Sequence, residues 1–101
     1  MNEAQKTAYQ EKMEAKLTKI RADIQRLEGE LKERKADARF GMQEQLQRLR
    51  ERSEGVKVKL HGLKTASGAA WIQAREGVAS AWSDLVSAFE KAGAEFRQHG
   101  E

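Results

Sequence analysis

The chain has 101 residues, of which 35% are charged and 6% are aromatic, and it contains neither cysteine nor proline. This composition excludes disulfide and thiol chemistry, and it lacks the residue that breaks helices most strongly. A net charge of +3 is small for a dedicated nucleic-acid-binding protein. Together these features predict one elongated helical unit with a thin apolar seam.

The first predicted element is a helix whose apolar residues recur at alternating spacings of four and three. This pattern is typical of a coiled coil, and it is carried by Met13, Leu17, Ile20, Ile24, Leu27 and Leu31. Asn2 is the predicted N-cap, with Gln5 in the capping-box position. Such a seam needs a partner helix, from this chain or from another.

The apolar pattern slips by one residue after Ala38 and then continues in the new phase. The residues of this second stretch are Met42, Leu46, Leu49, Val56, Leu60 and Leu63. We interpret the slip as a stutter, which locally unwinds a coiled coil without ending the helix. Because the phase runs straight past Gly55, we expect one helix over about 3–65, with a hairpin at Gly55 as the main alternative.

A second helix is predicted over about 68–97, after a break at Thr65–Gly68. Its apolar stripe, taken at helical spacing, is Trp71, Val78, Trp82, Leu85, Phe89, Ala92 and Phe96. The chain thus divides into a charged heptad-repeat part (1–66) and an Ala- and Trp-rich amphipathic part with a frayed end (67–101). If Ser67–Gly68 turns, the stripe folds back on the first helix; if not, the whole chain is one helix.

The expected fold class is all-α, either a helical hairpin or a single long helix, assembled as an oligomeric bundle. The second helix is too short to cover the Met13–Leu31 half of the first, so we predict a homo-oligomer, either a dimer or a tetramer. The candidate core and interface residues are Met13, Leu17, Ile20, Ile24, Leu27, Leu31, Leu46, Leu49, Val56, Leu60, Leu63, Trp71, Val78, Trp82, Leu85, Phe89 and Phe96.

Two segments of the chain, Tyr9–Leu17 and Leu63–Trp71, are familiar, as are Gly77, Trp82 and Phe89 beyond them. With the charged heptad middle, they resemble a family of small bacterial coiled-coil stress-response proteins. The resemblance spans nearly the whole chain. It implies an all-helical fold and a role under stress, with no assigned catalytic activity.

No pattern of residues predicts an enzyme. The two histidines, His61 and His99, are far apart in the sequence, and neither has another histidine at helical spacing. We interpret His61 as a surface residue. The glycines are isolated, so no phosphate-binding loop is expected. We therefore predict no catalytic, cofactor-binding or metal-binding residues and no small-molecule substrate.

No apolar run approaches the ~20 residues that span a bilayer, and Met1–Gln5 does not begin like a secretory signal. We expect a soluble, cytoplasmic protein. Its predicted function is non-enzymatic self-association. One alternative is binding to a membrane surface through 68–97, although the polar face there is mainly acidic. Another is weak binding to nucleic acid through 48–64, which carries six Lys and Arg against two Glu but no aromatic residue for base stacking.

Overall fold

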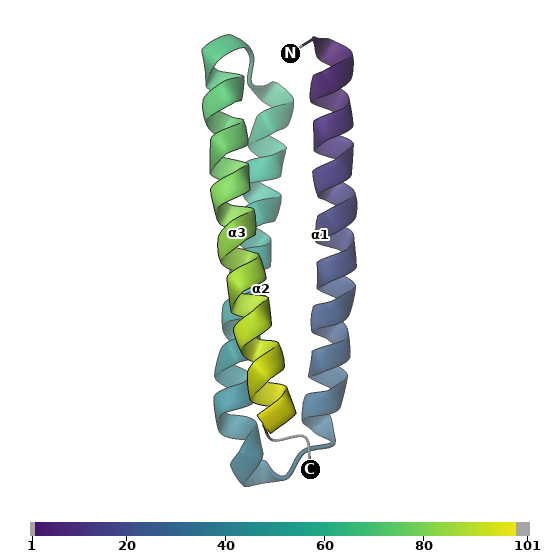
Figure 1. The fold of residues 1–101 in the computed structure, drawn as a ribbon, viewed down its shortest axis with the longest axis vertical. Coiled ribbons are helices and arrows are strands. Elements are labelled where there is room, and N and C mark those ends of the chain that lie inside the picture. Colours follow the sequence, from purple (N-terminus) through teal and green to yellow (C-terminus); the bar gives the residue numbers. More distant parts are fainter. Residues whose placement is uncertain (1, 99–101) are drawn as a thin grey trace.

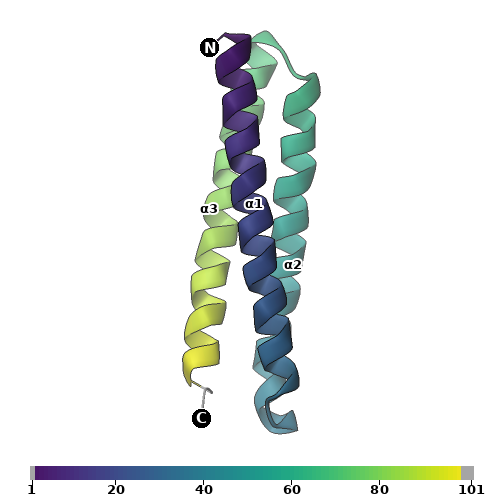
Figure 2. The ribbon, with the colours of Figure 1, turned by 90° about the vertical axis from the view of Figure 1, so that its right-hand side faces the viewer.

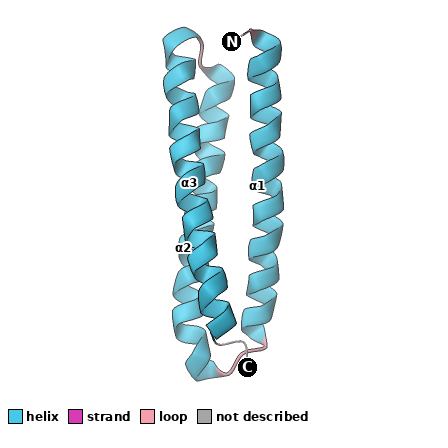
Figure 3. Cartoon of the chain, viewed as in Figure 1, coloured by secondary structure: helices cyan, strands magenta, loops and turns pink. Residues whose placement is uncertain are grey.

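A computed structural model describes residues 2–98, apart from the side chain of Ala38. It contains three helices: α1 (Glu3–Lys32), α2 (Ala36–Thr65) and α3 (Gly68–Gln98). They lie side by side in a rod of 51 × 17 × 17 Å, with α2 antiparallel to the other two (Figure 1). The predicted all-α class is confirmed, since only short loops join the helices (Figure 3).

The start of α1 matches the sequence prediction. The Gln5 backbone N–H donates to Asn2 Oδ1 at 2.8 Å, and the Asn2 backbone N–H donates to Gln5 Oε1 at 3.0 Å. This reciprocal pair satisfies two backbone donors that a helix N-terminus otherwise leaves unpaired. The predicted capping box is therefore confirmed.

The prediction of one helix over 3–65 is wrong, because the chain turns at 33–35. The backbone N–H groups of Glu33 and Arg34 donate to the carbonyls of Glu30 and Leu31, and α2 begins at Ala36. Arg39 of α2 then reaches back and donates to the carbonyls of Lys32 and Arg34, at 3.1 and 2.8 Å. These bonds satisfy one carbonyl at the end of α1 and one in the turn.

The one-residue slip in the apolar pattern therefore marks a turn and not a stutter. A turn and a stutter both reset the phase of a seam, so the slip alone does not separate them. The hairpin at Gly55, the main alternative, is not formed either, because Gly55 lies within α2.

The second turn lies where the sequence predicts it. α2 ends at Thr65, Ala66 and Ser67 form the link, and α3 begins at Gly68. Gly68 has a φ of +58°, which places it in the left-handed region that glycine enters without steric penalty. The helix predicted over about 68–97 corresponds to α3, and the predicted frayed end beyond residue 98 lies outside the described residues.

The core runs along the centre of the rod and receives residues from all three helices. Seen from the side of α1, α2 and α3 flank that helix (Figure 2). Most of the predicted core residues are buried: Met13, Leu17, Ile20, Ile24, Leu46, Leu49, Val56, Leu60, Leu63, Trp71, Val78, Leu85 and Phe96. Four are half-buried: Leu27, Leu31, Trp82 and Phe89. Met42, Ala88 and Ala92 complete the buried apolar set, and Ser53 is buried among them.

Because α2 folds back along α1, the Met13–Leu31 seam has a partner within its own chain. The argument that this seam lacks a partner is therefore wrong, although the oligomer itself stays a prediction. Any contact between copies must therefore be made mainly by residues that are exposed in the single chain.

An aromatic cluster joins α1 to α3 at the end of the rod where both helices begin. The Tyr9 and Trp71 rings meet edge to face, with centroids 6.0 Å apart. Lys6 Nζ and the Arg75 guanidinium lie 5.4 and 5.6 Å from the Trp71 ring centroid, within cation–π range. Burial raises the pKa of the Tyr9 phenol, and the positive charge of Arg75 partly opposes that shift.

Candidate interaction groove

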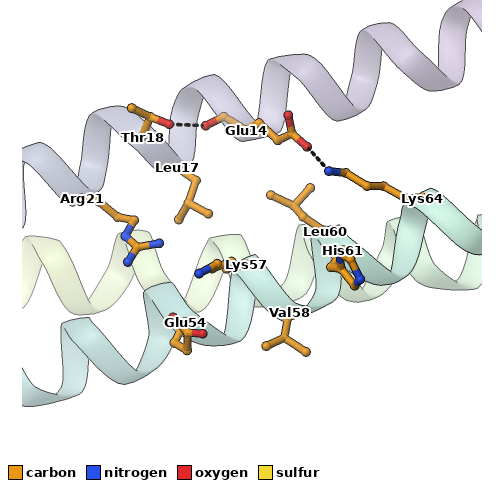
Figure 4. A pocket seen from close by; sticks show the side chains of 10 residues that line it. All are labelled: Glu14, Leu17, Thr18, Arg21, Glu54, Lys57, Val58, Leu60, His61 and Lys64. Atoms are coloured by element: carbon orange, nitrogen blue, oxygen red, sulfur yellow. Dashed lines mark hydrogen bonds and ion pairs between the residues drawn. The ribbon is translucent and has the colours of Figure 1, made fainter.

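An open groove of about 570 Å³ lies between α1 and α2 (Figure 4). Its lining residues alternate between apolar and charged. They are Glu14, Leu17, Thr18 and Arg21 from α1, and Glu54, Lys57, Val58, Leu60, His61 and Lys64 from α2.

The floor and one rim of the groove are apolar. Leu17 and Leu60 are buried and lie between the two helices (Figure 4). Val58 points away from α1 toward solvent and is 62% exposed. A β-branched apolar side chain in this position contributes little to the core of its own chain. It is therefore available to pack against another molecule.

The two ends of the groove each carry an acidic and a basic residue. At one end, Glu14 Oε1 lies 3.5 Å from Lys64 Nζ and forms an ion pair across the groove. At the other end, Arg21 of α1 lies opposite Glu54 of α2 (Figure 4). Both partners of the Glu14–Lys64 pair are about half exposed, so the pair itself contributes little stability. The charges mainly determine which surface fits this groove.

Among the described residues, side chains that could bind a metal ion or carry out acid–base chemistry line the groove only as single groups. No group of three or more His, Cys, Asp or Glu side chains within residues 2–98 is placed to hold a metal ion. His61 is exposed, as predicted, and lines the groove without a histidine beside it. His99 lies outside the described residues. The arrangement is suited to binding an apolar surface with alternating charge.

Sequence reasoning did not predict that these residues would form a groove. Glu14, Thr18 and Arg21 were not singled out, because charged and polar residues on a heptad helix usually form its solvated faces. Val58 carried a signal that was overlooked. It follows the seam residue Val56 by two positions, so it falls outside the apolar stripe of its helix. An apolar side chain out of phase with the seam is a candidate contact residue.

Comparisons of the chain with family models, with curated proteins and with solved structures give no match. None of the described helices is both long and apolar enough to cross a membrane. The resemblance to bacterial stress-response proteins therefore stays a prediction.

Proposed function

We propose that this chain is a non-enzymatic helical protein that binds a second copy of itself through the groove between α1 and α2. The observation that carries the proposal is the exposed Val58 beside the apolar floor formed by Leu17 and Leu60. The resemblance at the two ends of the chain is the reason to propose that this self-association serves a stress response.

The order of charges along the groove allows a two-fold, antiparallel pair, and that is the orientation we propose. In a two-fold interface, residue i of one copy meets residue j of the other, and j meets i. Turning one copy end over end brings its Glu14 toward Arg21 of the second copy, and its Lys64 toward Glu54. Each cation then meets an acid, so the charges of two antiparallel grooves are complementary.

The membrane alternative has less support. The apolar stripe of α3 that would enter a lipid surface is packed in the core, where Trp71, Val78, Leu85 and Phe96 are almost fully buried. A lipid surface would have to compete with these contacts. The groove needs no such opening, because Val58 is exposed in the folded chain.

The proposal is tested by measuring molar mass over a range of concentrations by sedimentation velocity. The single chain has a mass of 11.4 kDa, and we expect the mass to double as concentration rises. Val58→Glu should abolish the doubling without changing helix content, because the side chain is already in solvent. Ile72→Glu is the matched control, since Ile72 is also exposed, at 52%, but lies on α3.

A mass of one chain at every concentration would contradict the proposal. So would an equal loss of dimer in the Ile72→Glu control, because the contact would then not be specific to the groove.

The orientation has its own test. Arg21→Glu places like charges opposite each other at both symmetric positions and should weaken the dimer. Adding Glu14→Lys to Arg21→Glu restores opposite charges and should recover part of the affinity. A double variant that is weaker than Arg21→Glu alone would contradict the antiparallel arrangement.

A further inference from the structure

The basic residues of α2 divide into two groups, which face different neighbours. Toward α1, Arg50 Nε lies 3.0 Å from Glu28 Oε1, and Lys64 pairs with Glu14. Toward α3, Arg48 and Arg52 line a second hollow of about 330 Å³. In the sequence, 48–64 is one continuous basic stretch. In the fold, one flank of it forms ion pairs with α1 and the other flank lies beside α3.

The flank toward α3 combines cations from two helices. Its hollow is lined by Gln45, Arg48 and Arg52 of α2 and by Asp84, Ser87, Ala88 and Lys91 of α3. Arg48, Arg52 and Lys91 are exposed, and within residues 2–98 none of them forms an ion pair. Asp84 is the one carboxylate among these described lining residues. Three cations thus face solvent beside one acid, with no ion pair that a ligand would have to break.

The positions of the cations follow the axis of the rod. Arg48 and Arg52 are one helical turn apart, a rise of about 6 Å. Lys59 continues the line two turns further along, and its Nζ lies 3.9 Å from the position that a Cβ on Gly77 would occupy. The missing side chain at Gly77 leaves Lys59 room to lie across α3. The line therefore extends over roughly 16 Å of α2.

We propose that this α2/α3 face binds the phosphate backbone of double-stranded nucleic acid without reading its sequence. Guanidinium groups bind phosphate oxygens with two parallel hydrogen bonds, and clustered charge is sufficient for contact with the backbone. No aromatic side chain lines the described hollow, so it offers no platform for stacking unpaired bases. A duplex, which presents phosphates along a straight axis, is the polyanion that fits.

A lipid surface fits this face less well than a duplex does. Phe40, Val58 and Ile72 are the large apolar side chains that are well exposed on the described residues, and none of them lines the hollow. The face therefore has no apolar group to insert among acyl chains. This inference does not depend on the proposed self-association, because it uses a different groove.

The test measures fluorescence anisotropy of a short labelled DNA duplex with the full chain at several salt concentrations. Three phosphate contacts give a slope of about −2.7 in log affinity against log salt, or about 40-fold weaker binding at 200 mM than at 50 mM. The triple variant Arg48→Gln, Arg52→Gln and Lys91→Gln should lose most of the binding and flatten the slope.

The control is a triple variant with the same net charge, Lys12→Gln, Lys16→Gln and Lys19→Gln, on the exposed face of α1. It should keep nearly all of the affinity if the site is local. Equal losses in the two triple variants would overturn the proposal, since net charge alone would then explain binding. No anisotropy change at 50 mM salt would overturn it as well.

A second measurement separates nucleic acid from lipid. Vesicles rich in phosphatidylserine should bind more weakly than the duplex at the same salt concentration, because a duplex presents its phosphates at a higher density along one axis. Vesicle binding that requires Arg48, Arg52 and Lys91, in the absence of duplex binding, would assign the face to a membrane and overturn the proposal.

Discussion

The two interfaces that α2 forms with its neighbours are built differently. Against α3, the contact is dense. The fully buried residues there are Leu49, Val56, Val78, Leu85 and Ala92. Small residues of α3 such as Ala88 and Ala92 lie in the buried set, which allows close approach of the helices. The α2–α3 hairpin is therefore the more tightly packed half of the rod.

Against α1, the contact is narrower and more polar. The seam of α1 buries Met13, Leu17, Ile20 and Ile24, but Leu27 and Leu31 stay half-buried. Ion pairs such as Arg50–Glu28 cross this interface. Thus α1 is held by a short apolar seam with polar contacts at its edges. This narrow contact also leaves a groove between α1 and α2 for another molecule.

A large effect is expected at the α2–α3 interface. Leu85→Ala removes a fully buried side chain and should lower the free energy of unfolding by about 2–5 kcal/mol. Leu27→Ala in the half-buried part of α1 should lower it by much less, because less surface returns to water. Urea denaturation measures both values, and equal losses would contradict the difference in packing.

Ile24→Asp tests the α1 seam but not the dimer. Ile24 is 3% exposed within a single chain, so the substitution buries an unpaired charge and should unfold or strongly destabilise the protein. Circular dichroism would detect the lost helix. A fully folded Ile24→Asp chain would show that α1 separates easily from α2. The exposed Val58 is for this reason the better position for probing association.

Two glycines, one at the turn after α2 and one inside α2, should respond to substitution in opposite ways. Gly68→Ala should cost about 1–2 kcal/mol, because alanine at a φ of +58° is strained even though its Cβ meets no neighbour. Gly55→Ala, inside α2 with open space at its Cβ, should instead add about 0.5–1 kcal/mol. Thermal unfolding of the two variants should move the midpoint in opposite directions, and a shift in the same direction would refute the assignment of the turn.

A smaller effect is expected at the first turn. Arg39→Gln removes two hydrogen bonds to the carbonyls of Lys32 and Arg34 and should lower stability by about 0.5–1.5 kcal/mol. The urea midpoint should fall while the denaturant slope stays constant. A change in slope would mean that α1 no longer docks as a unit with the rest of the rod.

The smallest effect concerns the contact between α1 and α3. Tyr9 is the single tyrosine of the chain, so the ultraviolet absorbance of its phenolate reports this contact alone. Burial raises its pKa above the ordinary value of 10.0. The neutral phenol is favoured in the folded state, so its contribution to stability is present below pH 10 and is lost as pH rises through the folded pKa.

The phenolate should therefore form at higher pH in the folded chain than in urea. Arg75→Gln should raise the folded pKa further, because the positive charge of Arg75 lowers it. Equal titration curves in buffer and in urea would show that α1 does not pack on α3 at this end.

The sequence by itself determined the features that depend on neighbouring residues. Capping by Asn2 and Gln5 and the turn before Gly68 follow from local backbone chemistry. The all-α class and most of the buried positions follow from the spacing of apolar residues, because a helix repeats its faces every 3.6 residues. Of the candidate groove, only Leu17 and Leu60 were identified in this way, as core residues.

The tertiary structure alone decided where the first helix ends. Glu33, Arg34 and Lys35 include neither glycine nor proline, and their intrinsic preferences are compatible with a continuous helix. The chain turns there because burying the seam of α1 against α2 outweighs the few helical hydrogen bonds that a turn gives up. The same folding placed the basic residues of α2 on two flanks and left Val58 beside an open groove. Neighbouring helices, and not sequence position, determine which face of a helix is covered.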